Sequence, residues 1–231
     1  MQQSINFCTQ PPTNSDVKSY GRRADILRAL DRYGSLSVHG LSQIVIPRIK
    51  DRRLRDALFR LEKRGLIYKR FDCLPNNSAG FYENSRCYKV QNEIRNILGA
   101  NYDPFKDARV RDQELIHNEQ VAIWHTRFES LFYDARAYFD HEILQSEKSK
   151  NILWIDYNSF RKRPDILISF GSGKNSNQDE SGNIAIEVER SRKSEKRIRE
   201  KLKKYTRATF LDGVIYICPS RSILDFIARV Y

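Results

Sequence analysis

The sequence of 231 residues predicts an α/β protein, α+β overall, that is built from two parts. In residues 20–91, three short helical patterns precede two strand-like runs, whereas residues 112–231 interleave strand patterns with amphipathic helices. A polar leader, 1–19, and a connector, 92–111, complete the chain. We expect the first part to consist of three helices and a β-hairpin. We expect the second part to contain a mixed central sheet that is flanked by helices.

The composition narrows the class of protein. Hydrophobic residues make up 40% of the chain, which is enough to bury a core and too many for a disordered basic tail. No apolar run is long enough to span a membrane, and the N-terminal residues lack a secretory signal. The four scattered cysteines predict neither a zinc site nor a disulfide framework. We therefore expect a cytoplasmic, DNA-associated protein with no membrane partner.

The positive charge is concentrated in two blocks. The chain has 41 Lys and Arg residues against 29 Asp and Glu residues, a net charge of +12. Residues 47–70 carry ten basic and three acidic residues, and residues 190–207 carry ten basic and two acidic ones. The rest of the chain is slightly acidic. This distribution therefore indicates two surfaces that bind a polyanion, and not a positive charge that only keeps the protein soluble.

The pattern of residues 20–91 is typical of a winged helix-turn-helix. Helices are predicted over Arg22–Tyr33, over Val38–Val45 with Ser37 as its cap, and from Asp51 to the stop at Gly65. Strands are predicted over Leu66–Phe71 and Tyr82–Val90. In this arrangement the third helix enters the major groove of double-stranded DNA, and the wing meets phosphates.

Basic residues on the third helix and the wing are the candidate DNA contacts of the first part. A guanidinium binds guanine bidentately or clamps a phosphate, so the arginines early in this helix are well placed. A solvated charged face and a protein-binding winged helix are the alternatives. The candidates are Lys50, Arg52, Arg53, Arg55, Lys69 and Arg70.

The second part is predicted to begin with a long helix, Asp112 to about Tyr138, on which His117 is interpreted as a core residue. Strands and helices then alternate, with a Gly-, Ser- and Asn-rich hairpin loop at 171–183. The predicted strands are Tyr138–Leu144, Asn151–Tyr157, Asp165–Phe170, Ile184–Glu189 and a buried Gly213–Cys218, and the later helices are Ser191–Ala208 and Arg221–Tyr231.

Three acidic residues stand on two of these strands. Asp165 starts one strand, and Glu187 and Glu189 lie two apart on another and so share a face. Neighbouring carboxylates repel one another unless a cation lies between them, and Mg²⁺ is one such cation. The alternative is a set of ion pairs with the surrounding arginines, which are Arg161, Arg163, Arg190 and Arg192.

Taken together, these motifs resemble the core of the PD-(D/E)xK nuclease superfamily. The matching residues are Arg-Pro-Asp165-Ile-Leu-Ile, Ile-Ala-Ile-Glu187-Val-Glu189 and the basic helix with Lys201-Leu-Lys-Lys-Tyr205. With the predicted winged helix and the Leu-Ile-His117-Asn-Glu-Gln-Val segment, residues 20–220 are similar to the replication-relaxation family of plasmids and other mobile elements.

The resemblance implies roles for individual residues. Asp165 and Glu187 match the metal-binding acids, and Mg²⁺ or Mn²⁺ would be the cofactor. Glu189 stands where the superfamily usually has its lysine, so the base would be a carboxylate, or Lys201 would supply the lysine from the following helix. An additional upstream acid would be Glu142 or Glu129.

Two functions follow from this resemblance. The first is a metal-dependent DNA endonuclease or nickase targeted by the winged helix. The second is a non-catalytic DNA-binding factor for replication, mobilisation or transcription, with a degenerate nuclease fold. In both, the basic residues around the acids, Arg161, Arg163, Arg190, Arg192 and Lys193, would grip the DNA backbone. Symmetric cleavage of both strands would need a homodimer, and the sequence leaves the oligomeric state open.

Overall fold

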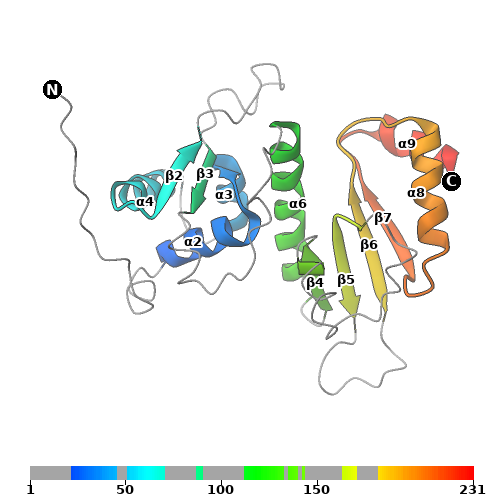
Figure 1. The fold of residues 1–231 in the computed structure, drawn as a ribbon, viewed down its shortest axis with the longest axis horizontal. Coiled ribbons are helices and arrows are strands. Elements are labelled where there is room, and N and C mark those ends of the chain that lie inside the picture. Colours follow the sequence, from blue (N-terminus) through cyan, green and yellow to red (C-terminus); the bar gives the residue numbers. More distant parts are fainter. Residues whose placement is uncertain are drawn as a thin grey trace. The chain divides into compact units, whose positions relative to one another are not determined.

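The structure is a computed structural model, and it is a mixed α+β protein (Figure 1). The chain divides into two compact units, with the boundary between Glu119 and Gln120. No helix of the described part of the chain is long and apolar enough to cross a membrane. The residues that the structure describes are 22–45, 51–70, 87–90, 112–132, 135–139, 142–143, 163–170 and 182–231.

Three helices form the core of the first unit. They are α2 (Arg22–Tyr33), α3 (Val38–Val45) and α4 (Asp51–Lys63), and their predicted bounds are confirmed. Gly34 and Gly65 follow α2 and α4 with φ angles of 78° and 68°, a left-handed conformation that glycine adopts without strain. The buried side chains of these helices are Ile26, Leu27, Leu30, Leu41, Leu54, Leu58 and Leu61.

A small antiparallel sheet completes this unit. Strands β2 (Ile67–Arg70) and β3 (Cys87–Val90) pair with each other, as the sequence predicts. A third strand, β1 (Leu36–Ser37), pairs with the other edge of β3 and was not predicted. With two residues, it is too short to show a period in the sequence. The segment between the two predicted strands lies outside the described residues.

The first helix of the second part ends earlier than the sequence predicts. Helix α6 runs over Asp112–Leu131, and β4 follows at Ala135–Phe139, so extension of the helix to Tyr138 is wrong. The predicted strand Tyr138–Leu144 begins and ends earlier than expected, and Glu142 and Ile143 are helical. The reason is tertiary, because β4 pairs along its whole length with β5 (Ile166–Phe170).

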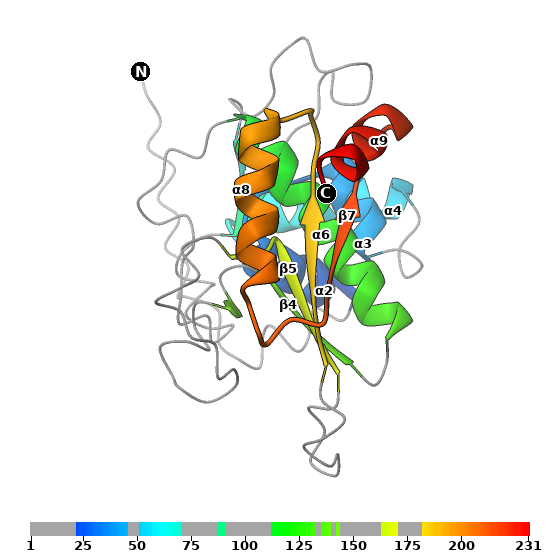
Figure 2. The same ribbon diagram turned by 90° about the vertical axis from the view of Figure 1, so that its right-hand side faces the viewer.

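The sheet of the second unit is mixed and has four strands in the order β4-β5-β6-β7. Strands β4, β5 and β6 (Asn183–Val188) are antiparallel neighbours, whereas β6 and β7 (Gly213–Ile217) run parallel. Helix α8 (Glu195–Thr206) makes the crossover that a parallel pair requires (Figure 2). The mixed sheet is therefore confirmed for the described residues.

Helices cover both faces of this sheet (Figures 1 and 2). On one face, Phe132 beyond α6 contacts Phe170 of β5 with ring centroids 5.5 Å apart. On the other face, Tyr205 of α8 packs against Ala185 of β6. Helix α9 (Arg221–Val230) packs against α8 through Ile198, Phe226, Ile227 and Val230.

The cap of α8 and the burial of β7 differ from what the sequence predicts. The cap of α8 is Ser194 and not Ser191, because the Ser194 side chain accepts a hydrogen bond from the Arg197 N–H. Strand β7 lies at the edge of the sheet and is only half-buried, so its prediction as a buried strand was wrong. The predicted strand at 151–157 and the connector at 92–111 lie outside the described residues. Most of the predicted loop at 171–183 lies outside them as well.

Candidate active site

Asp165, Glu187 and Glu189 come together on the face of the sheet that α8 covers. Ile166 of β5 is paired with Ile186 of β6, so Asp165 and Glu187 are the next residues on adjacent strands. Side chains alternate along β6, which places Glu187 on the same side as Ala185 and therefore under α8. The Asp165 carboxylate also accepts a hydrogen bond of 2.7 Å from the Val188 N–H, which fixes the start of β5 against β6.

Glu187 is fully buried and is held by two residues of α8. Lys201 and Tyr205 lie one helical turn apart and point to the same side of the helix. The Lys201 ammonium donates to Oε2 of Glu187, and the Tyr205 hydroxyl donates to Oε1. Glu187 itself has no exposed surface, so these two donors replace the water that a carboxylate would otherwise bind.

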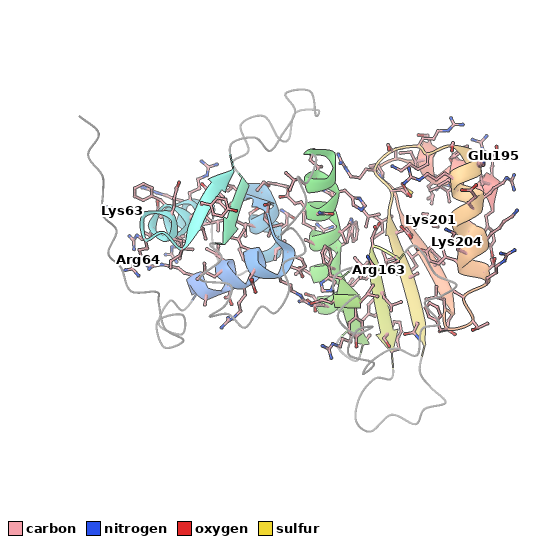
Figure 3. The ribbon with its side chains drawn as sticks, viewed as in Figure 1. Lys63, Arg64, Arg163, Glu195, Lys201 and Lys204 are labelled. Atoms are coloured by element: carbon pink, nitrogen blue, oxygen red, sulfur yellow. The ribbon has the colours of Figure 1, made fainter. Side chains whose placement is uncertain are left out.

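Lys201 lies between two carboxylates. Besides its contact with Glu187, its Nζ is 3.5 Å from Oε1 of Glu189. The other oxygen of Glu189 is 3.8 Å from Nζ of Lys193. Figure 3 shows Lys201 on the side of α8 that faces the sheet. A cation therefore separates the two acids, and it is Lys201 of the protein itself, which the ion-pair alternative did not name.

The charges in this group shift one another's pKa values. Burial raises the pKa of Glu187 well above its ordinary value, and the neighbouring Asp165 carboxylate raises it further, against the effect of Lys201. Burial also lowers the pKa of Lys201, but Glu187, Asp165 and Glu189 outweigh burial, and the net shift is upward. Lys201 is therefore a fixed positive charge at neutral pH and not a proton acceptor.

Tyr216 adds a buried polar group to this site. It is paired with Glu187 in the register of β6 and β7, so both side chains lie on the same face. Its hydroxyl oxygen is buried and has no hydrogen-bond partner among the described residues. Burial raises its pKa, and Glu187 adds to that shift, so the hydroxyl stays protonated. A buried donor without a partner costs free energy, which a bound water or ligand oxygen would recover.

Asp165 and Glu187 are the residues of this site that could hold a magnesium ion. Mg²⁺ is bound through one or two carboxylates together with water and substrate phosphates, and Asp165 and Glu187 provide two adjacent carboxylates. Each carboxylate has about four lone-pair sites, so the bonds from Lys201 and Tyr205 do not exhaust Glu187. Across the described ranges, no group of three or more His, Cys, Asp and Glu side chains is arranged to hold a metal ion. A metal here would thus depend on the two acids and on oxygens from outside the protein.

Glu142 is not part of this group. Its Oε2 accepts a hydrogen bond of 2.9 Å from the Phe139 N–H and lies 3.7 Å from Nε2 of His125. On the other side of the same ring, Nδ1 of His125 is 3.6 Å from Glu129. Both candidates for the additional acid, Glu142 and Glu129, therefore flank a histidine of α6.

His125 is the buried histidine of α6, and the sequence did not single it out. His125 has no exposed surface, whereas His117, which was predicted to be a core residue, is only half-buried. Nε2 of His125 lies 3.1 Å from the Ala137 carbonyl oxygen. The only signal in the sequence was its spacing of one helical turn from Val121 and Glu129.

The basic residues of the second unit are partly engaged within the protein. Arg192 stacks over the ring of Phe226, with 4.1 Å between its Cζ and the ring centroid, and Lys193 contacts Glu189. Arg163 and Arg190 are half-buried, and Arg161 lies outside the described residues. The outward face of α8 carries additional exposed basic residues, which are Lys196, Arg197, Arg199, Lys203 and Arg207.

In the first unit, the basic residues of α4 lie opposite its core face. Leu54, Leu58 and Leu61 are buried, whereas Arg52, Arg53, Arg55 and Lys63 are exposed. Figure 3 labels Lys63, which lies in the last turn of α4. Lys50 lies outside the described residues, as do the side chains of Lys69 and Arg70 of β2.

Comparisons of the chain with protein-family models, with curated proteins and with solved structures found no match.

Proposed function

We propose that this chain is a DNA-binding protein that nicks or cleaves DNA by metal-dependent phosphodiester hydrolysis. The observation that carries the proposal is the position of Lys201, whose ammonium contacts Glu187 and Glu189 on the sheet beside Asp165. Lys201 thereby lies between two acids of a group of three, with Lys193 on the far oxygen of Glu189. The proposal agrees with the resemblance to the PD-(D/E)xK superfamily, with the lysine supplied by the helix after the E-x-E strand.

The residues have distinct proposed roles. Asp165 and Glu187 would hold Mg²⁺ or Mn²⁺, which polarises the phosphate and lowers the pKa of a bound water. Lys201, which remains protonated, stabilises negative charge that develops on the phosphate. Glu189 accepts the proton of the attacking water, and the Tyr216 hydroxyl donates to an oxygen of the water or phosphate.

The first unit would bring the DNA to this site. Its three helices and antiparallel strands support a winged helix-turn-helix, and α4 would lie in the major groove. Arg52, Arg53 and Arg55 would contact phosphates or guanines. The same build supports the replication-relaxation likeness and an origin in a plasmid, phage or other mobile element.

Incubation with supercoiled plasmid in Mg²⁺ or Mn²⁺ tests the cleavage. We expect nicked or linear product from the wild-type protein, and a loss of roughly 100-fold in rate for Asp165→Asn and for Lys201→Met. Lys203→Met is the matched control, because Lys203 is exposed on another side of the same helix. Full cutting by Asp165→Asn would sink the proposed site.

A non-catalytic DNA-binding factor is the second candidate, and the closed state of Glu187 favours it. Both of its oxygens carry hydrogen bonds from α8, and no surface is left for solvent. In this case Lys201 only neutralises the buried acids. Salt-dependent DNA binding together with an intact plasmid under both metals would establish this candidate over the nuclease.

A further inference from the structure

Phe59 is a large apolar side chain at the centre of the basic face of α4. It is 64% exposed, although the opposite face of the helix buries Leu58 and Leu61 almost completely. At 100° per residue, Phe59 lies within about one sixth of a turn of Arg52, Arg55 and Lys63 around the helix axis. Those three side chains are also exposed and place positive charge on both sides of the ring, while Asp56 and Glu62, three residues before and after Phe59, lie at the margins of the same face.

The Phe59 side chain does not pack in the core of the first unit. Leu54, Ala57, Leu58 and Leu61 already fill the inward face of α4, and Phe59 points away from them. The three basic residues nearest the ring around the helix axis outnumber the two acids at the margins of the face, so the face fits a polyanion better than an apolar protein surface, which would have to desolvate all of these charged groups. The apolar centre must then meet an apolar group within a polyanion.

Duplex DNA offers such a group in its major groove. The C5-methyl of thymine is the apolar feature of the groove, and aromatic side chains are among the residues that contact it. We propose that Phe59 contacts a thymine methyl group and so makes the protein prefer thymine at one position of its site. This inference rests on the proposed DNA binding by α4, and it assigns a preference for thymine, which the charged arginines do not provide.

The test begins with selection of bound duplexes from a random-sequence pool by the wild-type protein and by Phe59→Ala. We expect the wild-type pool to be enriched in thymine at one position, and the Phe59→Ala pool to lose that enrichment. The selected duplex is then made with deoxyuridine at this position, which removes only the methyl group. The wild-type protein should bind it about threefold to fourfold more weakly, the factor expected for burial of one methyl group, and Phe59→Ala should bind both duplexes equally.

Controls separate the outcomes. Ile215→Ala removes another exposed apolar side chain, in the second unit, and should keep the thymine preference. Equal wild-type binding to the two duplexes would overturn the role of Phe59 but leave DNA binding in place. Failure of the wild-type protein to bind any duplex would overturn both proposals. A change of oligomeric state in Phe59→Ala with an unchanged thymine preference would identify the ring as a protein contact and overturn the inference.

Discussion

The two units each bury a glutamate, and they neutralise it in different ways. Glu119 of the first unit is 3% exposed and accepts hydrogen bonds from the Ser37 N–H and the Ser37 hydroxyl. Glu187 of the second unit is bonded by a lysine and a tyrosine and has two additional carboxylates beside it. Neutral donors suffice for an isolated carboxylate, whereas a cluster of acids requires a cation.

This difference separates a structural glutamate from a candidate functional one. The Glu119 contacts join α6 to β1 across 82 residues of the chain, and the Ser37 hydroxyl in turn accepts from the Gly40 N–H at the start of α3. These contacts require only the single carboxylate of Glu119. Around Glu187, in contrast, Asp165 and Glu189 add charge that raises the pKa of Glu187. Such a concentration lowers stability, and a metal-binding role would account for it.

The largest expected effect on stability is that of Lys201→Met. Without the ammonium, Glu187 remains buried between two other acids, and removal of one partner of a buried ion pair costs about 3 kcal/mol or more in free energy of unfolding. Lys203→Met, at an exposed position of α8, should change this free energy by less than about 0.5 kcal/mol. Urea denaturation followed by circular dichroism measures both, and equal stability of the two variants would remove the distinction between the two glutamates.

A pair of isosteric changes sharpens the comparison further. Glu187→Gln keeps the shape of the side chain and relieves repulsion from Asp165, so we expect the free energy of unfolding to change by less than about 1 kcal/mol while plasmid cleavage falls roughly 100-fold. Glu119→Gln should leave cleavage within about twofold of the wild-type rate, because Glu119 is not among the proposed site residues. If both variants lost cleavage to the same extent, the loss would reflect damage to the fold and would say nothing of a role for Glu187 in cleavage.

Much of the fold was predictable because its signals are local. The bounds of α2, α3 and α4 follow from apolar spacing and from the glycines after α2 and α4. The end of α6 was not predictable, because Ala135–Phe139 becomes a strand only through pairing with β5. The same holds for β1, whose two residues are defined by a partner that lies 50 residues later in the chain.

The candidate site was predictable to a similar extent. Alternation along β6 predicted Glu187 and Glu189 on one face, and the resemblance named Lys201 as a lysine supplied by the following helix. The contacts of Glu119 with Ser37 and of His125 with Glu142 were not predictable, since they join distant segments and depend on tertiary packing. Sequence patterns indicated which acids would meet but not that α8 would close over them.

The stability of the first unit should fall as the pH rises through the raised pKa of Glu119. Burial raises this pKa above the ordinary value of 4.5, against the two hydrogen bonds from Ser37. The folded state thus holds the proton more tightly than the unfolded state, and the resulting stabilisation is present below the ordinary pKa and lost above the raised one. Urea denaturation at a series of pH values should show this slope, and Glu119→Gln should lack it.

Glu200→Gln serves as the control for that measurement, because Glu200 is an exposed residue of α8. Its pH slope should equal that of the wild-type protein. If Glu119→Gln also kept the wild-type slope, Glu119 would not be the group that titrates, and its assignment as a buried carboxylate held by neutral donors would be wrong.

The smallest expected effect comes from Gly40→Ala, which tests how tightly Glu119 is held. An added Cβ would lie 2.4 Å from both Cδ and Oε2 of the Glu119 side chain, so the side chain must move and weaken its bonds to Ser37. We expect a loss of about 1 kcal/mol in the free energy of unfolding, close to the net value of one hydrogen bond. In a Glu119→Ala background the same change should cost almost nothing, because the clash and the bonds are both absent. A double-mutant cycle measures this coupling, and additive effects of the two changes would mean that Glu119 does not pack against Gly40.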